Sequence, residues 1–143
     1  MILKNTDENA IITVSSRQVA DDESDSFEFI TSGSYYQRGG KYYIFYKENE
    51  EMQMSNCNVM LIAEKGKVTM RRSGDFELKM TYIEGESEDI IYYMPFGEMN
   101  LTQKTNSIKC ELADDGGTLL LDYTLIIGDR VQENSVNIKV KRK

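Results

Sequence analysis

Residues 114–140 read DDGGTLLLDYTLIIGDRVQENSVNIKV, and this stretch decides the fold. Apolar residues alternate along both halves of it, which is the period-two pattern of strands with one buried face. Gly128-Asp129 separates the halves, and both residue types tolerate the positive φ angles of a two-residue hairpin loop. The stretch therefore predicts a β-hairpin whose register can be assigned. Counting outward from the loop gives two apolar pairs, Leu121 with Val136 and Leu119 with Ile138.

The end of this hairpin nearest the loop has a partly polar inward face. The same count places Tyr123 opposite Asn134 and Leu125 opposite Gln132. On the inner face of a barrel, polar groups near one end indicate either a hydrated mouth or a ligand contact. We therefore name Tyr123, Gln132 and Asn134 as the candidate ligand-binding residues at a barrel mouth. A hydrated barrel end without a ligand is the alternative.

Two hairpins upstream follow the same rules. Each has a short loop that contains glycine between two alternating segments. In each, counting from the loop keeps apolar residues opposite apolar residues, so one face stays inward. The pairs that this predicts are Tyr35 with Ile44 around Gly39-Gly40, and Leu61 with Met70 around Lys65-Gly66.

A further hairpin turns near Ser73-Gly74. A two-residue loop there mixes apolar and charged residues on each face, whereas the three-residue loop 72–74 pairs Met70 with Phe76. We prefer the longer loop, because glycine suits the third, left-handed position of a three-residue hairpin. Arg72 then lies at a hairpin tip, either solvated or facing an anion.

Polar segments between the alternating runs are expected to be loops or turns. The acidic run 19–26 lacks the ligand spacing of an EF-hand and is interpreted as a solvated loop. Residues 47–56 are interpreted as a connection, and Thr105-Asn106-Ser107 as a turn. The segment Met94-Pro95-Phe96-Gly97 should form a sharp corner, since proline cannot donate to a strand ladder.

Turn signals divide the chain into about eight to eleven short alternating segments, the first at residues 8–16, without a convincing amphipathic helix. Consecutive hairpins of this kind form an antiparallel meander. A long meander with one apolar face usually closes on itself, because closure removes the exposed edges. We therefore expect an all-β, closed antiparallel meander barrel that forms one domain over residues 1–143.

An aromatic cluster is predicted on the outside of this barrel. The register around Gly39-Gly40 places Tyr36 opposite Tyr43 and Ser34 opposite Phe45 on the outward face. Tyrosine and phenylalanine are enriched in protein interfaces. Tyr36, Tyr43 and Phe45 are therefore candidate interface residues for a homodimer. Ordinary cross-strand packing beneath the acidic run or a terminal segment is the alternative.

Charge and hydropathy exclude several kinds of partner. The 143 residues include 17 Lys and Arg against 24 Asp and Glu, which gives a formal net charge of −7. That sign disfavours binding to nucleic acid and to anionic membranes. No apolar run has the length of a signal peptide or a membrane helix. We expect a cytoplasmic protein.

The residue types also limit the chemistry. Histidine is absent, which removes Ser-His-Asp and Cys-His catalysis and most zinc sites. No glycine-rich phosphate loop is present. We therefore expect no enzyme, no cofactor and no metal site. The two cysteines, Cys57 and Cys110, are expected to be free and largely buried.

Five segments, in their order and spacing, resemble the YwiB-like family of bacterial β-barrel proteins, over about residues 10–140. The resemblance implies a calycin-like barrel, related in shape to lipocalins, in a bacterial cytoplasm, and it supplies no catalytic residues. The segments are Gly33-Ser34-Tyr35-Tyr36, Gly40-Lys41-Tyr42-Tyr43, Arg71-Arg72-Ser73-Gly74, Pro95-Phe96-Gly97 and Gly116-Gly117-Thr118-Leu119-Leu120-Leu121-Asp122-Tyr123.

Two functions remain open on the sequence. The first is a binding module whose interior or mouth takes a small, partly apolar ligand beside Tyr123, Gln132 and Asn134. The second is a protein-interaction or homodimeric barrel with a filled core. Barrels of about eight strands can be filled by their own side chains or can hold one ligand, so the pattern alone favours neither.

Overall fold

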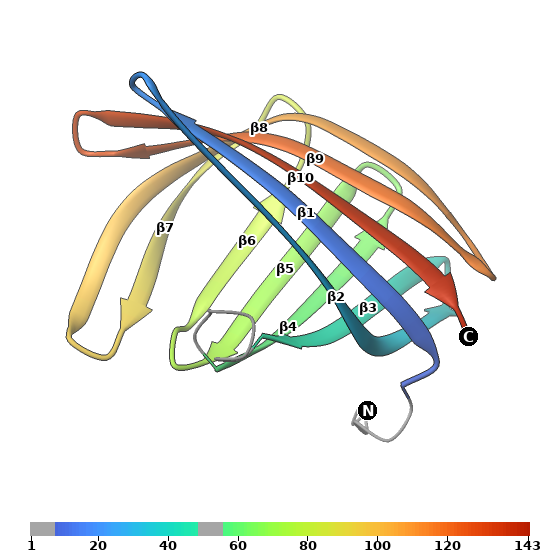
Figure 1. Ribbon diagram of the computed structural model, residues 1–143. Helices are drawn as coiled ribbons and strands as arrows, with labels where there is room; N and C mark the ends of the chain where they lie inside the picture. The colour runs from blue at the N-terminus through green and yellow to red at the C-terminus, as the bar shows by residue number, and fades with distance from the viewer. Residues whose placement is uncertain (1–7, 49–55) are drawn as a thin grey trace.

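The computed structural model describes residues 8–48 and 56–143, and these residues form ten β-strands (Figure 1). Long alternating segments form long strands, because each buries one face along its whole length. The strands are β1 (Ala10–Ala20), β2 (Glu23–Arg38), β3 (Lys41–Glu48), β4 (Cys57–Glu64), β5 (Lys67–Gly74), β6 (Leu78–Tyr82), β7 (Ser87–Met94), β8 (Gly97–Ala113), β9 (Gly116–Ile127) and β10 (Arg130–Arg142).

The strands form one antiparallel sheet in the order β6-β5-β4-β3-β2-β1-β10-β9-β8-β7. The first and last strands of the chain therefore lie side by side, with β4, β5 and β6 on the wall across from them (Figure 1). The sheet ends at β6 and β7, which are consecutive in the chain. Among the described residues, one isolated antiparallel bridge pairs Glu77, just before β6, with Tyr93 of β7. The predicted all-β meander barrel is confirmed, with closure nearly complete.

The registers predicted from short loops are confirmed. Around Gly128-Asp129, Leu121 pairs with Val136, and the polar pairs follow as predicted. The hairpin of β2 and β3 and that of β4 and β5 also have the predicted registers. The confirmed pairs are Leu119 with Ile138, Tyr123 with Asn134, Leu125 with Gln132, Tyr35 with Ile44, Tyr36 with Tyr43, Ser34 with Phe45 and Leu61 with Met70.

The predicted loop at 72–74 is wrong. Strand β5 continues to Gly74, which pairs with Cys57, and Met70 pairs with Met80 rather than with Phe76. The extension is stabilised where Asp75 donates its backbone N–H to the carbonyl of Asn56 at 3.0 Å and its carboxylate accepts from the backbone N–H of Asn56 at 3.0 Å. Arg72 consequently lies within a strand and not at a hairpin tip.

Three other polar segments are also more regular than predicted. The acidic run 19–26 belongs to a long β1–β2 hairpin that turns at Asp21-Asp22, because its residues keep pairing, as Gln18 does with Asp25. The first strand accordingly continues past residue 16 to Ala20. Residues 105–107 form a β-bulge inside β8 and not a turn. The predicted connection 47–56 is shortened by Lys47 and Glu48, which extend β3; its residues 49–55 lie outside the described part.

The segment with the single proline turns the chain as predicted. Met94 pairs with Gly97, so Pro95 and Phe96 form a two-residue loop between β7 and β8. Phe96 is 83% exposed at this tip. The proline lies where no ladder hydrogen bond is needed, which is the position that its missing N–H permits.

Gly33 allows β2 to pass from one wall to the next. It pairs with Ala10 of β1, and the next residue, Ser34, pairs with Phe45 of β3. A Cβ atom at residue 33 would meet the carbonyl oxygen of Phe45 and Cδ1 of Ile12 at separations that no real Cβ adopts. Only glycine therefore fits this crossing without displacing β3.

The Gly33→Ala variant should be less stable by about 1–3 kcal/mol, the usual cost of overpacking a well-packed site. Urea unfolding followed by circular dichroism measures the change. Ser26→Ala, at an exposed position on the same strand, is the control and should leave stability within about 0.5 kcal/mol. Equal stability of the two variants would contradict the close approach at Gly33.

Candidate functional site

The interior of the barrel contains a cavity of about 300 Å³. All three residues predicted as ligand contacts, Tyr123, Gln132 and Asn134, contribute to its lining. Asn134 is buried, whereas Tyr123 and Gln132 are half-buried. The structure therefore places the three predicted residues on one interior surface.

One group of wall residues is apolar. Its members come from β4, β5, β6, β8, β9 and β10, because inward-facing residues alternate along each strand. These side chains provide the apolar surface that can remove a ligand from water. Its members are Val59, Leu61, Met70, Leu78, Met80, Met99, Leu101, Leu121, Leu125, Ile127, Val136 and Ile138.

A second group of wall residues is polar. Besides the three predicted residues, five others take part that the sequence did not single out as ligand contacts. Some belong to strands whose extent the sequence underestimated, notably Gln18 of β1 and Arg72 of β5. The additional polar residues are Gln18, Tyr46, Arg72, Tyr82 and Tyr92.

A partly buried ion pair between Arg72 and Glu48 lies at the polar part of the cavity. Arg72 donates from Nε to Glu48 Oε1 at 3.1 Å and from Nη2 to Glu48 Oε2 at 3.0 Å. The Glu48 side chain is 5% exposed and that of Arg72 is 23% exposed. Burial lowers the pKa of Arg72, but the adjacent Glu48 carboxylate raises it by more, so the net shift of the pKa is upward. Arg72 is therefore a cation held in a bidentate fork.

Tyrosine side chains surround this pair. The rings of Tyr82 and Tyr123 make an edge contact with centroids 5.0 Å apart, and Tyr82 donates its hydroxyl to Sδ of Met80 at 3.1 Å. Burial raises the pKa of Tyr46, Tyr82 and Tyr123 above the ordinary value. These phenols are neutral at pH 7, so they offer hydrogen bonds but no charge.

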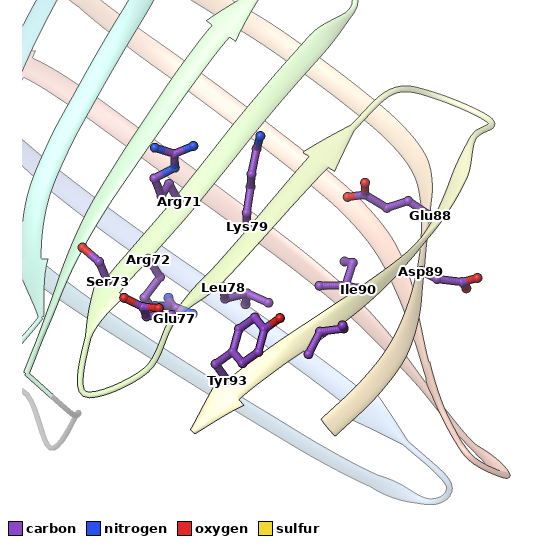
Figure 2. A pocket seen from close by; sticks show the side chains of 11 residues that line it. Arg71, Arg72, Ser73, Glu77, Leu78, Lys79, Glu88, Asp89, Ile90 and Tyr93 are labelled. Atoms are coloured by element: carbon purple, nitrogen blue, oxygen red, sulfur yellow. The ribbon is translucent and has the colours of Figure 1, made fainter. Parts of the chain in front are cut away.

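A groove of about 540 Å³ lies on the outside where β6 and β7 separate (Figure 2). Arg71 and Lys79 stand on its β5 and β6 side, and Glu88 and Asp89 on its β7 side (Figure 2). Arg72 and Leu78 contribute to both this groove and the interior cavity. The groove and the cavity therefore share part of the wall beside the seam between β6 and β7.

Hydrogen bonds outside the strand ladders complete part of the seam between β6 and β7. Thr81 donates its backbone N–H to the carboxylate of Glu88 at 2.6 Å. Beyond the turn, Gly85 donates its N–H to the carbonyl of Thr105 at 2.9 Å, and Thr105 donates to the carbonyl of Glu86 at 3.0 Å. The seam is thus stabilised without a continuous ladder.

The predicted interface residues lie together on the outer face, as their register requires. The rings of Tyr36 and Tyr43 stack with centroids 4.9 Å apart. Phe45 pairs with Met60, and Tyr43 with Ile62, so two further apolar residues extend the cluster onto β4. All five side chains are half-buried. We call Tyr36, Tyr43, Phe45, Met60 and Ile62 the outer apolar band.

The cysteines differ from each other. Both are free, with Cys57 buried and Cys110 exposed. The expectation that Cys110 is buried is wrong. Strand β7 pairs with β8 only as far as Lys104, so none of the ten described strands covers the edge of β8 at Cys110.

Residues 8–48 and 56–143 contain neither a cluster of metal ligands nor a membrane-spanning helix. No group of three or more His, Cys, Asp or Glu residues is arranged to hold a metal ion. No helix in this part of the chain has the length and apolar character needed to cross a membrane.

The interior tyrosines should titrate only when the protein unfolds. An ordinary tyrosine has a pKa of about 10, and a raised pKa keeps the native phenol protonated while the unfolded chain ionises. Stability should therefore fall as the pH rises above about 10. Absorbance of tyrosinate should rise in step with loss of near-ultraviolet circular dichroism. Ionisation of all nine tyrosines near pH 10 with a native spectrum would contradict the burial of these groups.

Comparison with known proteins gives one family. The family described as "Domain of unknown function (DUF1934)" matches residues 12–139. The uncharacterized β-barrel protein YwiB of Bacillus subtilis strain 168 is 30% identical over 131 residues, which cover 90% of each chain. The crystal structure of the ywiB protein from Bacillus subtilis is similar with a TM-score of 0.85 and 26% identity, over 94% of this chain and 92% of that one. This chain, with its nearly closed ten-stranded barrel, thus belongs to the DUF1934 family.

Proposed function

We propose that this protein is a binding module that holds one small, partly apolar ligand inside the barrel. The observation that supports it is the interior cavity of about 300 Å³ whose lining includes Tyr123, Gln132 and Asn134. Ligand sites are typically concave and apolar with a few polar groups that fix orientation. The lining has this composition.

The walls favour recognition by shape and apolar contact. In the described residues, no buried side-chain nitrogen or oxygen lacks a hydrogen-bond partner. No fully buried polar atom is therefore left unsatisfied in an empty cavity, and removing apolar surface from water should supply most of the affinity. A flat or compact molecule with one polar end matches the two groups of wall residues.

We further propose that the barrel is calycin-like, works in a bacterial cytoplasm and acts by binding without catalysis. The negative net charge of −7 supports a ligand other than nucleic acid. The absence of histidine supports binding over acid–base chemistry at neutral pH.

Filling the cavity should abolish binding. Leu125 is half-buried and lines the cavity, whereas its neighbour Ile126 is 39% exposed on the other face of β9. We expect Leu125→Trp to weaken binding of the neutral dye N-phenyl-1-naphthylamine by at least about tenfold, because the indole occupies the space of the ligand. Dye fluorescence on titration measures the affinity.

Ile126→Trp is the matched control and should bind the dye as the wild-type protein does. Both variants should keep the circular dichroism spectrum of a β-protein. Equal dye affinity in the two folded variants would mean that the dye binds elsewhere. No dye binding by the wild-type protein would argue for a filled barrel.

A second candidate function is self-association through the outer apolar band. The stacked Tyr36 and Tyr43 rings and the continuation of the cluster onto β4 favour it, since aromatic residues and methionine are enriched in interfaces. In this reading two copies bury the band against each other.

Phe45→Lys should then convert a dimer into a folded monomer, because a lysine charge in the centre of an apolar contact is not solvated. Light scattering coupled to size-exclusion chromatography measures the mass. Ile126→Lys, on a strand far from the band in the sheet order, is the control and should remain dimeric. A wild-type protein with the mass of one chain would remove this candidate.

A further inference from the structure

The interior cavity contains one charged side chain. Of the described residues that line it, Arg72 alone is ionised at pH 7, and the others are apolar, amide or phenol groups. Burial raises the pKa of Tyr46, Tyr82, Tyr92 and Tyr123, which keeps those phenols neutral. The charge that a ligand meets therefore depends on Arg72 and on its partner.

Glu48 neutralises Arg72 from outside the cavity lining. The carboxylate is 5% exposed and holds Nε and Nη2 at 3.1 and 3.0 Å, but Glu48 is not part of the wall. A guanidinium has five N–H donors, so the two-bond fork leaves others for a further acceptor. A ligand consequently meets N–H donors whose positive charge is already compensated.

This arrangement distinguishes neutral from anionic ligands. A carbonyl oxygen can accept a hydrogen bond from Arg72 without bringing a charge into the barrel. A carboxylate must lose its hydration, and the cation that would offset this cost is already paired with Glu48. Like charges at close range also add repulsion between the ligand and Glu48.

We infer that Glu48 makes the cavity selective for uncharged ligands that carry a carbonyl-type acceptor, such as a carboxamide, and excludes the corresponding carboxylates. The inference rests on the proposed ligand-binding function. Glu48 is thus a specificity-determining residue that acts through Arg72 and does not touch the ligand.

Two nearly isosteric probes test the inference. 2-Naphthamide and 2-naphthoate differ mainly in charge, and each can be titrated against bound N-phenyl-1-naphthylamine. The wild-type protein should bind the amide at least about tenfold more tightly than the acid. Glu48→Gln should strengthen 2-naphthoate binding by at least about tenfold, because the freed guanidinium then pairs with the ligand.

Two further variants complete the design. Glu111→Gln changes the net charge equally but lies on β8 with 63% of its side chain exposed, and it should retain the wild-type preference. The double variant Glu48→Gln/Arg72→Met removes both charges. It remains testable if Glu48→Gln alone fails to fold because it leaves Arg72 without its partner. Its affinity for 2-naphthamide should fall several-fold relative to its affinity for the dye, since the donor is gone.

The outcomes separate the inference from the function on which it rests. A folded Glu48→Gln variant with an unchanged ratio of the two affinities would overturn the role of Glu48, and so would an unchanged ratio of amide to dye affinity in the double variant. If the role of Glu48 is overturned but Leu125→Trp still abolishes dye binding, the cavity would remain supported as a binding site. Absence of dye binding in the wild-type protein would overturn both.

Discussion

The pairing of the first strand with the last is the constraint on which the barrel depends. Strand β1 pairs with β10 from Ala10 with Arg142 to Ala20 with Gln132, and its other edge pairs with β2. Without this ladder, β1–β6 and β7–β10 would be two separate sheets, each with an open edge and an uncovered apolar face. The inward residues of both sheets meet only because β1 joins them. The opposite seam, between β6 and β7, is only partly paired, and Arg72 and Leu78 beside it line both the cavity and the outer groove.

The ion pair between Arg72 and Glu48 has a free-energy cost of desolvation. Removing two charges from water is unfavourable, and an apolar pair of similar volume often stabilises a protein as well or better. A pair that serves folding alone would gain nothing from a position on a cavity wall. Arg72 lies on such a wall and on the outer seam groove, with its fork committed to Glu48. The proposed role in recognition would account for this position.

Much of the fold could be predicted for two reasons. Short loops with glycine fix the register of a hairpin, and the alternation of apolar and polar residues shows which side chains face inward. Both principles are local, and they held for the hairpins at Gly39-Gly40, Lys65-Gly66 and Gly128-Asp129. The Asn56–Asp75 contact, which extends β5 and so moves the next turn, joins residues 19 apart and could not be seen locally. The bulge in β8 is likewise set by its pairing with β9.

The candidate site was only half predictable for a related reason. Tyr123, Gln132 and Asn134 belong to a hairpin with an assignable register, so their common face was visible. Glu48 and Arg72 belong to strands that continue into segments rich in polar residues. Extending the alternation of Ile44 and Tyr46 by one step would have placed Glu48 inward. Their pairing across the intervening β4 depends on the curvature of the sheet, which no local pattern encodes.

A crystal structure of the protein incubated with 2-naphthamide tests the central claim most directly, because it locates the ligand as well as detecting it. The account predicts one molecule inside the barrel, with its ring against the apolar wall and its carbonyl oxygen within hydrogen-bond distance of Arg72, while Glu48 keeps its fork. Density for the ligand only in the outer groove between β6 and β7, over an interior filled by side chains, would contradict it.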